Sequence, residues 1–170
     1  GSSLTGTGIV NVNAGATITI QNATTPNLGT MNATSTVNFN GTGAQTIPSE
    51  VYGNLVISGA RSGTPTITLS GTTTVANTFS VTATGTVSYA TSGNTFVYSA
   101  LTGGKTVESA IPYNNLTLSN ISGTNTADGN LTIAGVLTTT AGGTLDMGSY
   151  TLSVTGTPVN SGIIKTQNTG

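Results

Sequence analysis

Few residues of this chain could carry out acid–base or metal chemistry. There is no His and no Cys, and charged side chains make up only 4% of the 170 residues. The charged residues are Arg61, Lys105, Lys165, Glu50, Glu108, Asp128 and Asp146. General acid–base catalysis usually relies on a His or on two neighbouring carboxylates. The four acidic residues are therefore the first candidates for this chemistry.

Two pairs of acidic residues could be considered as catalytic pairs of carboxylates. Glu50 and Glu108 occupy loosely equivalent places in two copies of a sequence repeat, so a stacked fold would hold them a whole unit apart. Asp128 and Asp146 are 18 positions apart, about one coil of such a fold. Both spacings favour surface acids over a dyad. Ser is abundant but has no His or suitable Lys to activate it. We predict no enzymatic activity and no catalytic or cofactor-binding residue.

Metal-binding patterns are equally sparse. Zinc sites use Cys and His, which the chain lacks. Calcium loops need several carboxylates at short spacing, and calcium-binding β-roll repeats carry Gly-Gly-x-Gly-x-Asp. Neither pattern occurs. We predict no metal site, with a single carbonyl-rich calcium site around Asp128 or Asp146 as the alternative left open.

The charge balance also excludes classes of partner. A net charge of −1 with three scattered cations cannot neutralise a nucleic-acid backbone. There is no basic patch for an anionic membrane and no apolar run of about 20 residues to span one. We therefore predict no nucleic-acid binding and no membrane insertion. Low charge with abundant Thr, Asn and Gly is typical of bacterial surface proteins, which predicts an extracellular location at the cell surface.

Apolar residues recur with a period of two. Val37-Asn38-Phe39, Leu116-Thr117-Leu118 and Leu152-Ser153-Val154 are examples. Such alternation, interrupted every 8–12 residues or so by Gly, Asn and Ser, indicates half-buried strands and an all-β fold. Eight repeated apolar positions are expected to point inward: Leu55, Ile57, Leu116, Leu118, Leu131, Ile133, Leu152 and Val154.

An internal repeat of about 60 residues organises the chain. Tyr52–Gly59 matches Tyr113–Asn120, and Ile67–Gly71 matches Leu131–Gly135. The repeat predicts one continuous array, cut from a longer one: a partial repeat over 1–35, repeat units over 36–94 and 95–156, and the start of another over 157–170. The strand–turn cadence of about 10 residues, with an echo near 20, favours a β-solenoid. A tandem series of small β-sandwiches is the alternative.

The aromatic and amide side chains of the repeat have structural and binding interpretations. Exposed tyrosines in a row could stack on sugar rings. Because Tyr52 and Tyr113 are equivalent in two copies, we expect them instead to cap the apolar seam. Asn54 and Asn115 are expected to be stacked turn amides that bond from coil to coil.

Recurring Thr-x-Thr pairs raise the question of ice binding. Flat arrays of such pairs form the binding surface of β-solenoid ice-binding proteins, at one constant coil spacing. Here the gaps between pairs are irregular, which favours ordinary outward strand faces. Such pairs include Thr17-Thr19, Thr66-Thr68, Thr72-Thr74, Thr82-Thr84 and Thr138-Thr140.

Three phrases, at 37–48, 113–119 and 162–170, resemble the β-strand repeats of very large secreted surface proteins of Bacteroidetes. These include gliding-adhesin-like proteins exported by the type IX secretion system. The resemblance covers most of the chain from about residue 36. It implies extracellular placement, a tandem array and an adhesive or scaffolding role, and it supplies no catalytic motif.

The expected function is therefore that of a structural repeat module in a secreted surface adhesin or filament, forming a rod or stalk. Its expected partners are neighbouring repeats of the same protein or further copies stacked end to end, with surface polysaccharide as another candidate. The alternative is a binding module for ice or polysaccharide that uses a Thr/Asn/Tyr face.

Overall fold

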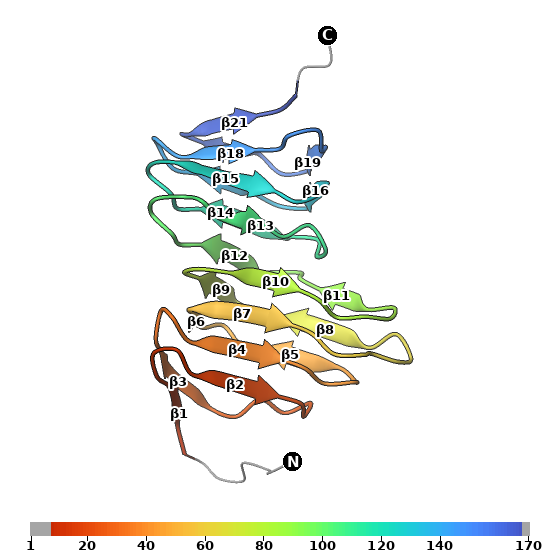
Figure 1. The fold of residues 1–170 in the computed structure, drawn as a ribbon. Coiled ribbons are helices and arrows are strands. Elements are labelled where there is room, and N and C mark those ends of the chain that lie inside the picture. Colours follow the sequence, from red (N-terminus) through yellow and green to blue (C-terminus); the bar gives the residue numbers. More distant parts are fainter. Residues whose placement is uncertain (1–7, 168–170) are drawn as a thin grey trace.

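The computed structural model of the protein describes residues 8–167, which form 21 short strands and no helix (Figure 1). The strands are β1 (Val10–Val12), β2 (Thr17–Ile20), β3 (Leu28–Met31), β4 (Thr36–Phe39), β5 (Gln45–Ile47), β6 (Val51–Tyr52), β7 (Asn54–Ile57), β8 (Thr66–Leu69), β9 (Thr72–Val75), β10 (Phe79–Val81), β11 (Ser88–Ala90), β12 (Thr95–Tyr98), β13 (Thr106–Val107), β14 (Asn115–Leu118), β15 (Thr124–Ala127), β16 (Leu131–Ile133), β17 (Leu137–Thr139), β18 (Thr144–Asp146), β19 (Leu152–Val154), β20 (Val159–Asn160) and β21 (Ile163–Lys165).

The strands wind into a parallel β-solenoid of about 7 turns, which confirms the predicted fold class. Each ladder between described strands is parallel and joins strands one coil apart, such as β2 with β4 and β4 with β7. We number the coils by their first strand: β1, β3, β6, β9, β12, β14, β17 and β20 begin coils 1 to 8. Figure 1 shows the coils stacked along one axis, with β1 and β21 at opposite ends.

The coils enclose one core between three walls, defined here by the order of strands within each coil. Wall 1 contains the sheets β1–β3 and β6–β9–β12–β14–β17–β20. Wall 2 contains β2–β4–β7–β10 and β13–β15–β18–β21. Wall 3 contains β5–β8–β11 and β16–β19. A solenoid suits this alternating sequence because the inner faces of all three walls share a core while the outer faces meet water.

The predicted inward positions build that core. Six of the eight are buried: Leu55, Ile57, Leu116, Leu118, Leu131 and Ile133. Leu152 and Val154 pack against the same core but are only half-buried. Their strand, β19, is the last of its sheet in the part of the chain that the structure describes, and there it pairs with β16 alone. The period of two therefore predicted which residues of each strand face the core. Leu152 and Val154 are less buried than the other six because they lie near the end of the described stack.

The structural repeat of the walls is the coil of about 20 residues, as in the pairing of Thr95 with Asn115. The longer sequence copies do not keep to one wall. Leu55 lies on β7 in wall 2, whereas its counterpart Leu116 lies on β14 in wall 1. Any wall accepts the same alternating phrase, because every wall buries one face in the common core. The division at residues 36, 95 and 157 stays a prediction. Residues 1–7 and 168–170 of its terminal segments lie outside the described residues.

Candidate functional site

The two glutamates have different surroundings. Glu108 follows β13, and its carboxylate accepts hydrogen bonds from the Val81 amide at 2.9 Å and the Ala110 amide at 3.1 Å. Glu50 precedes β6 and is half-buried. Glu108 therefore caps backbone N–H groups, one of them in the neighbouring coil, which is a structural use of a carboxylate.

The two aspartates also bind backbone amides. Asp128, directly after β15, accepts a hydrogen bond from the Ser109 amide at 2.8 Å. Asp146, at the end of β18, accepts one from the Gly148 amide at 2.8 Å. Within residues 8–167, no group of three or more His, Cys, Asp or Glu side chains is arranged to hold a metal ion. These carboxylates close turns and bridge coils.

The repeated tyrosines lie inside the solenoid, which confirms their predicted place in the seam. Tyr52 and Tyr113 are 0% and 1% exposed. The Tyr52 hydroxyl donates to the Pro48 carbonyl at 2.9 Å, and the Tyr113 hydroxyl donates to the Glu108 carbonyl at 2.5 Å. Burial raises the pKa of both phenols above the ordinary value. Neither ring is available to stack on a sugar.

Sequence reasoning missed an aromatic cluster in the middle of the rod. Phe96 lies with its ring centroid 4.6 Å from that of Phe79 and 5.6 Å from that of Tyr113. The hydroxyls of Tyr98 and Tyr113 lie 3.2 Å apart, and the Glu108 amide donates to the Tyr98 hydroxyl at 2.9 Å. Burial raises the pKa of Tyr98 as well. The one available signal was the alternation of aromatic residues in Thr95-Phe96-Val97-Tyr98.

The two repeated asparagines bridge consecutive coils, as predicted. In each, the side-chain nitrogen donates to a carbonyl of the coil before, and the side-chain oxygen accepts an amide of the coil after. The partners are the Ser35 carbonyl (2.9 Å) and Thr78 amide (3.3 Å) for Asn54, and the Asn94 carbonyl (3.4 Å) and Val136 amide (2.9 Å) for Asn115. Each amide thus links three coils at a corner where the regular ladder stops.

Arg61 is a buried structural residue, which its type alone did not reveal. It is 5% exposed and donates to the carbonyls of Phe39 at 3.0 Å and Gly43 at 2.8 Å, and to the Gln45 side-chain oxygen at 3.0 Å. The Gln45 side-chain nitrogen donates in turn to the Ile20 carbonyl at 2.8 Å. Burial lowers the pKa of the Arg61 guanidinium. These hydrogen bonds form a network that joins coils 1, 2 and 3. They also bury one of the three cations of the chain.

The Thr-x-Thr pairs are scattered over different walls and form no array of neighbouring pairs. Thr66 and Thr68 lie on β8 in wall 3, whereas Thr72 and Thr74 lie on β9 in wall 1.

Wall 1 carries a row of outward-facing side chains, called the outward ladder here, which the Thr-x-Thr pairs did not predict. Six β-branched residues stand in register on consecutive strands: Val51, Thr74, Val97, Thr117, Thr138 and Val159. The result is a row of methyl and hydroxyl groups with no charge.

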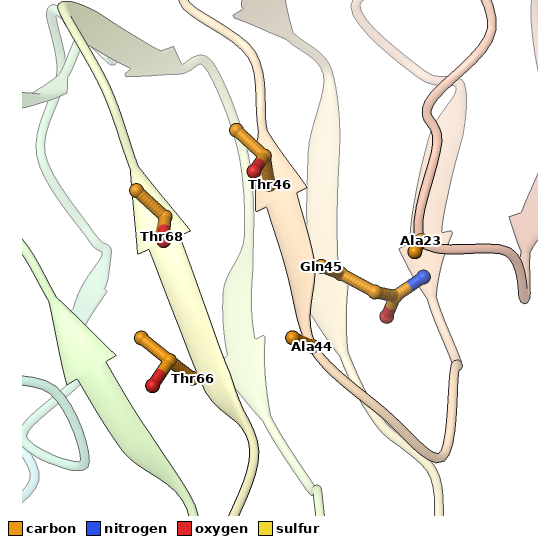
Figure 2. Close-up of a pocket in the computed structure, with 6 residues that line it drawn as sticks. All are labelled: Ala23, Ala44, Gln45, Thr46, Thr66 and Thr68. Atoms are coloured by element: carbon orange, nitrogen blue, oxygen red, sulfur yellow. The ribbon is translucent and has the colours of Figure 1, made fainter.

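A shallow groove lies on the outer surface of wall 3 (Figure 2). It is lined by Ala23, Ala44, Gln45, Thr46, Thr66 and Thr68. Thr46 and Thr68 are paired across β5 and β8. The Gln45 amide is already engaged in the connection to Arg61 and Ile20. The groove therefore offers threonine hydroxyls and methyl groups but no charged group or activated nucleophile.

Comparison of the chain with protein-family models, curated proteins and solved structures finds no match. Over residues 8–167 no helix is long and apolar enough to cross a membrane.

Proposed function

We propose that this chain is a structural repeat module of a secreted cell-surface adhesin or filament, in which it forms part of a rod or stalk. The observation that carries the proposal is the continuous parallel solenoid itself. Its charged and amide side chains hold the coils together. The carboxylates of Glu108, Asp128 and Asp146 accept hydrogen bonds from backbone amides, and Arg61 and Asn54 donate to carbonyls of neighbouring coils. Stacked coils of this kind make a stiff rod through nearest-neighbour contacts.

The ends of the described stack support assembly with further coils. Among the strands of residues 8–167, β2 pairs only with β4, and β20 and β21 pair only with β17 and β18. An edge strand presents unpaired backbone N–H and C=O groups that can template another strand. Neighbouring repeats of the same protein, or another copy stacked end to end, fit such an edge, and many weak contacts along an array would give adhesion by avidity.

Surface labelling of intact cells tests the proposed location and role. Antibodies raised against residues 8–167 are applied to intact and permeabilised cells of the encoding organism, with an antibody to a cytoplasmic protein as control. We expect equal labelling of intact and permeabilised cells, and loss of the signal after external protease. Labelling that appears only after permeabilisation would contradict the proposal.

The outward ladder of wall 1 favours ice binding as a second candidate function. Its side chains repeat at the strand spacing of about 4.8 Å, and β-branched residues hold fixed rotamers. Sugar binding has less support, because Tyr52, Tyr98 and Tyr113 are buried. Ice binding predicts thermal hysteresis that Thr117→Tyr in the ladder abolishes and that Thr132→Tyr, on exposed wall 3, leaves intact. Absence of hysteresis in the unmodified chain would exclude this candidate.

A further inference from the structure

The walls are not equally continuous along the rod. Between coils 3 and 4, ladders run on all three walls, through β6–β9, β7–β10 and β8–β11. Between coils 4 and 5 one ladder remains, that of β9 with β12 on wall 1. The first sheet of wall 2 ends at β10 and that of wall 3 at β11, and the next sheets there begin with β13 and β16. Of the joints between the described coils, this one has the fewest ladders.

A change of coil length accompanies the break. Coil 4 takes 23 residues from Thr72 to its partner Thr95, whereas coil 5 takes 20 from Thr95 to Asn115. Figure 1 shows β11 and its loop extending beyond the coil that follows.

Side chains replace the missing ladders at this joint. The Glu108 carboxylate of coil 5 accepts the Val81 amide of coil 4 at 2.9 Å. The Lys105 ammonium approaches the Asn77 side-chain oxygen at 3.4 Å, which is a weak contact. Phe79 of coil 4 packs on the ring of Phe96 in coil 5. Packing of this kind is non-directional, so it tolerates small rotations that would break a ladder of backbone hydrogen bonds.

We infer that the joint between coils 4 and 5 is a hinge of the rod. The pivot is wall 1, where β9 and β12 keep four residues in register. Walls 2 and 3 open and close about it, and Glu108 is the latch that holds wall 2 closed. The aromatic cluster keeps the core filled during the movement. This inference concerns only the chain's own coils, so it does not depend on the proposed surface role.

Spin-label distances across the joint test the hinge, because the chain has no Cys that would compete with introduced labelling sites. One pair of labels, at Thr46 and Thr132, spans coils 2 to 6 on wall 3. A matched pair, at Val51 and Thr138, spans coils 3 to 7 on wall 1. Both pairs cross four strand spacings, or about 19 Å, and both cross the joint. Each pair is measured in the parent chain, in Glu108→Ala and in Glu50→Ala.

The hinge predicts a distance distribution in Glu108→Ala that is at least about twice as broad on wall 3 as on wall 1, with a longer mean on wall 3. Glu50→Ala removes the same charge from a loosely equivalent place in the other sequence copy and should match the parent chain. Equal widths on the two walls in Glu108→Ala, whether narrow or broad, would overturn the proposal. The wall 1 pair also reports whether the variant keeps its fold, since unfolding would broaden both distributions together.

Discussion

Replacing Leu116 by Ala tests the register of the solenoid at its centre. Leu116 is fully buried on β14, in register with Phe96 on one side and Leu137 on the other. The substitution removes three buried carbons, one methine and two methyl groups, worth about 0.8 kcal/mol each, which together is roughly 2.4 kcal/mol of transfer free energy. The cavity adds to this, so the free energy of unfolding should fall by about 2–5 kcal/mol.

Thr117 is the matched control on the same strand. Its side chain faces outward and is half-exposed, so Thr117→Ala should change the free energy of unfolding by less than about 0.5 kcal/mol. Urea titration followed by circular dichroism gives both values, and the two variants report on one unfolding unit because they share β14. Equal losses at the two positions would refute the register, since a shift of one residue exchanges the inner and outer faces.

The remaining predictions concern amides, tyrosines and glycines. Asn115→Ala should lower the free energy of unfolding by about 1–3 kcal/mol, because it removes the partners of backbone groups in two coils; an unchanged urea midpoint would contradict this. Burial raises the pKa of Tyr98 and Tyr113 in the folded chain, so their contribution to stability is full below the ordinary pKa near 10 and falls as the pH rises above it. Melting temperatures measured from pH 8 to 11 should therefore decline only at the alkaline end, and a flat profile would count against the buried phenols. Gly142→Ala should destabilise by more than about 1 kcal/mol, because φ is +84° and a Cβ would lie 2.2 Å from the Ile121 carbonyl oxygen. Gly43→Ala, with nothing within 4 Å of the added Cβ, should be close to neutral in the same thermal melts.

Much of the fold could be predicted from the sequence because it depends on local pattern. The period of two placed Leu55, Ile57 and Leu131 in the core, and the recurrence of Asn54 as Asn115 indicated amides that bridge coils. These features repeat in each copy, so comparing the copies was enough to reveal them.

The features that sequence reasoning missed depend on contacts between different coils. Arg61 is one of three cations scattered along the sequence, and nothing in its position there predicts that it is buried against carbonyls of coil 2. The aromatic cluster and the latch at Glu108 arise where the coil length changes, and no repeat marks that place. The outward ladder of wall 1 depends on register, because its members are unevenly spaced in the sequence: Val51 and Thr74 are 23 positions apart, and Val97 and Thr117 are 20 apart.

End-to-end association is the most direct test of the rod. Within residues 8–167, β2 at one end and β20 and β21 at the other have one unpaired edge each, and these edges should pair with further coils. A net charge of −1 provides little repulsion between copies. Sedimentation velocity of the isolated chain over a concentration series is the measurement. We predict species that grow longer with concentration, with a frictional ratio that rises with mass. A strictly monomeric, compact species at the highest concentration would contradict the account of this chain as one link of a rod.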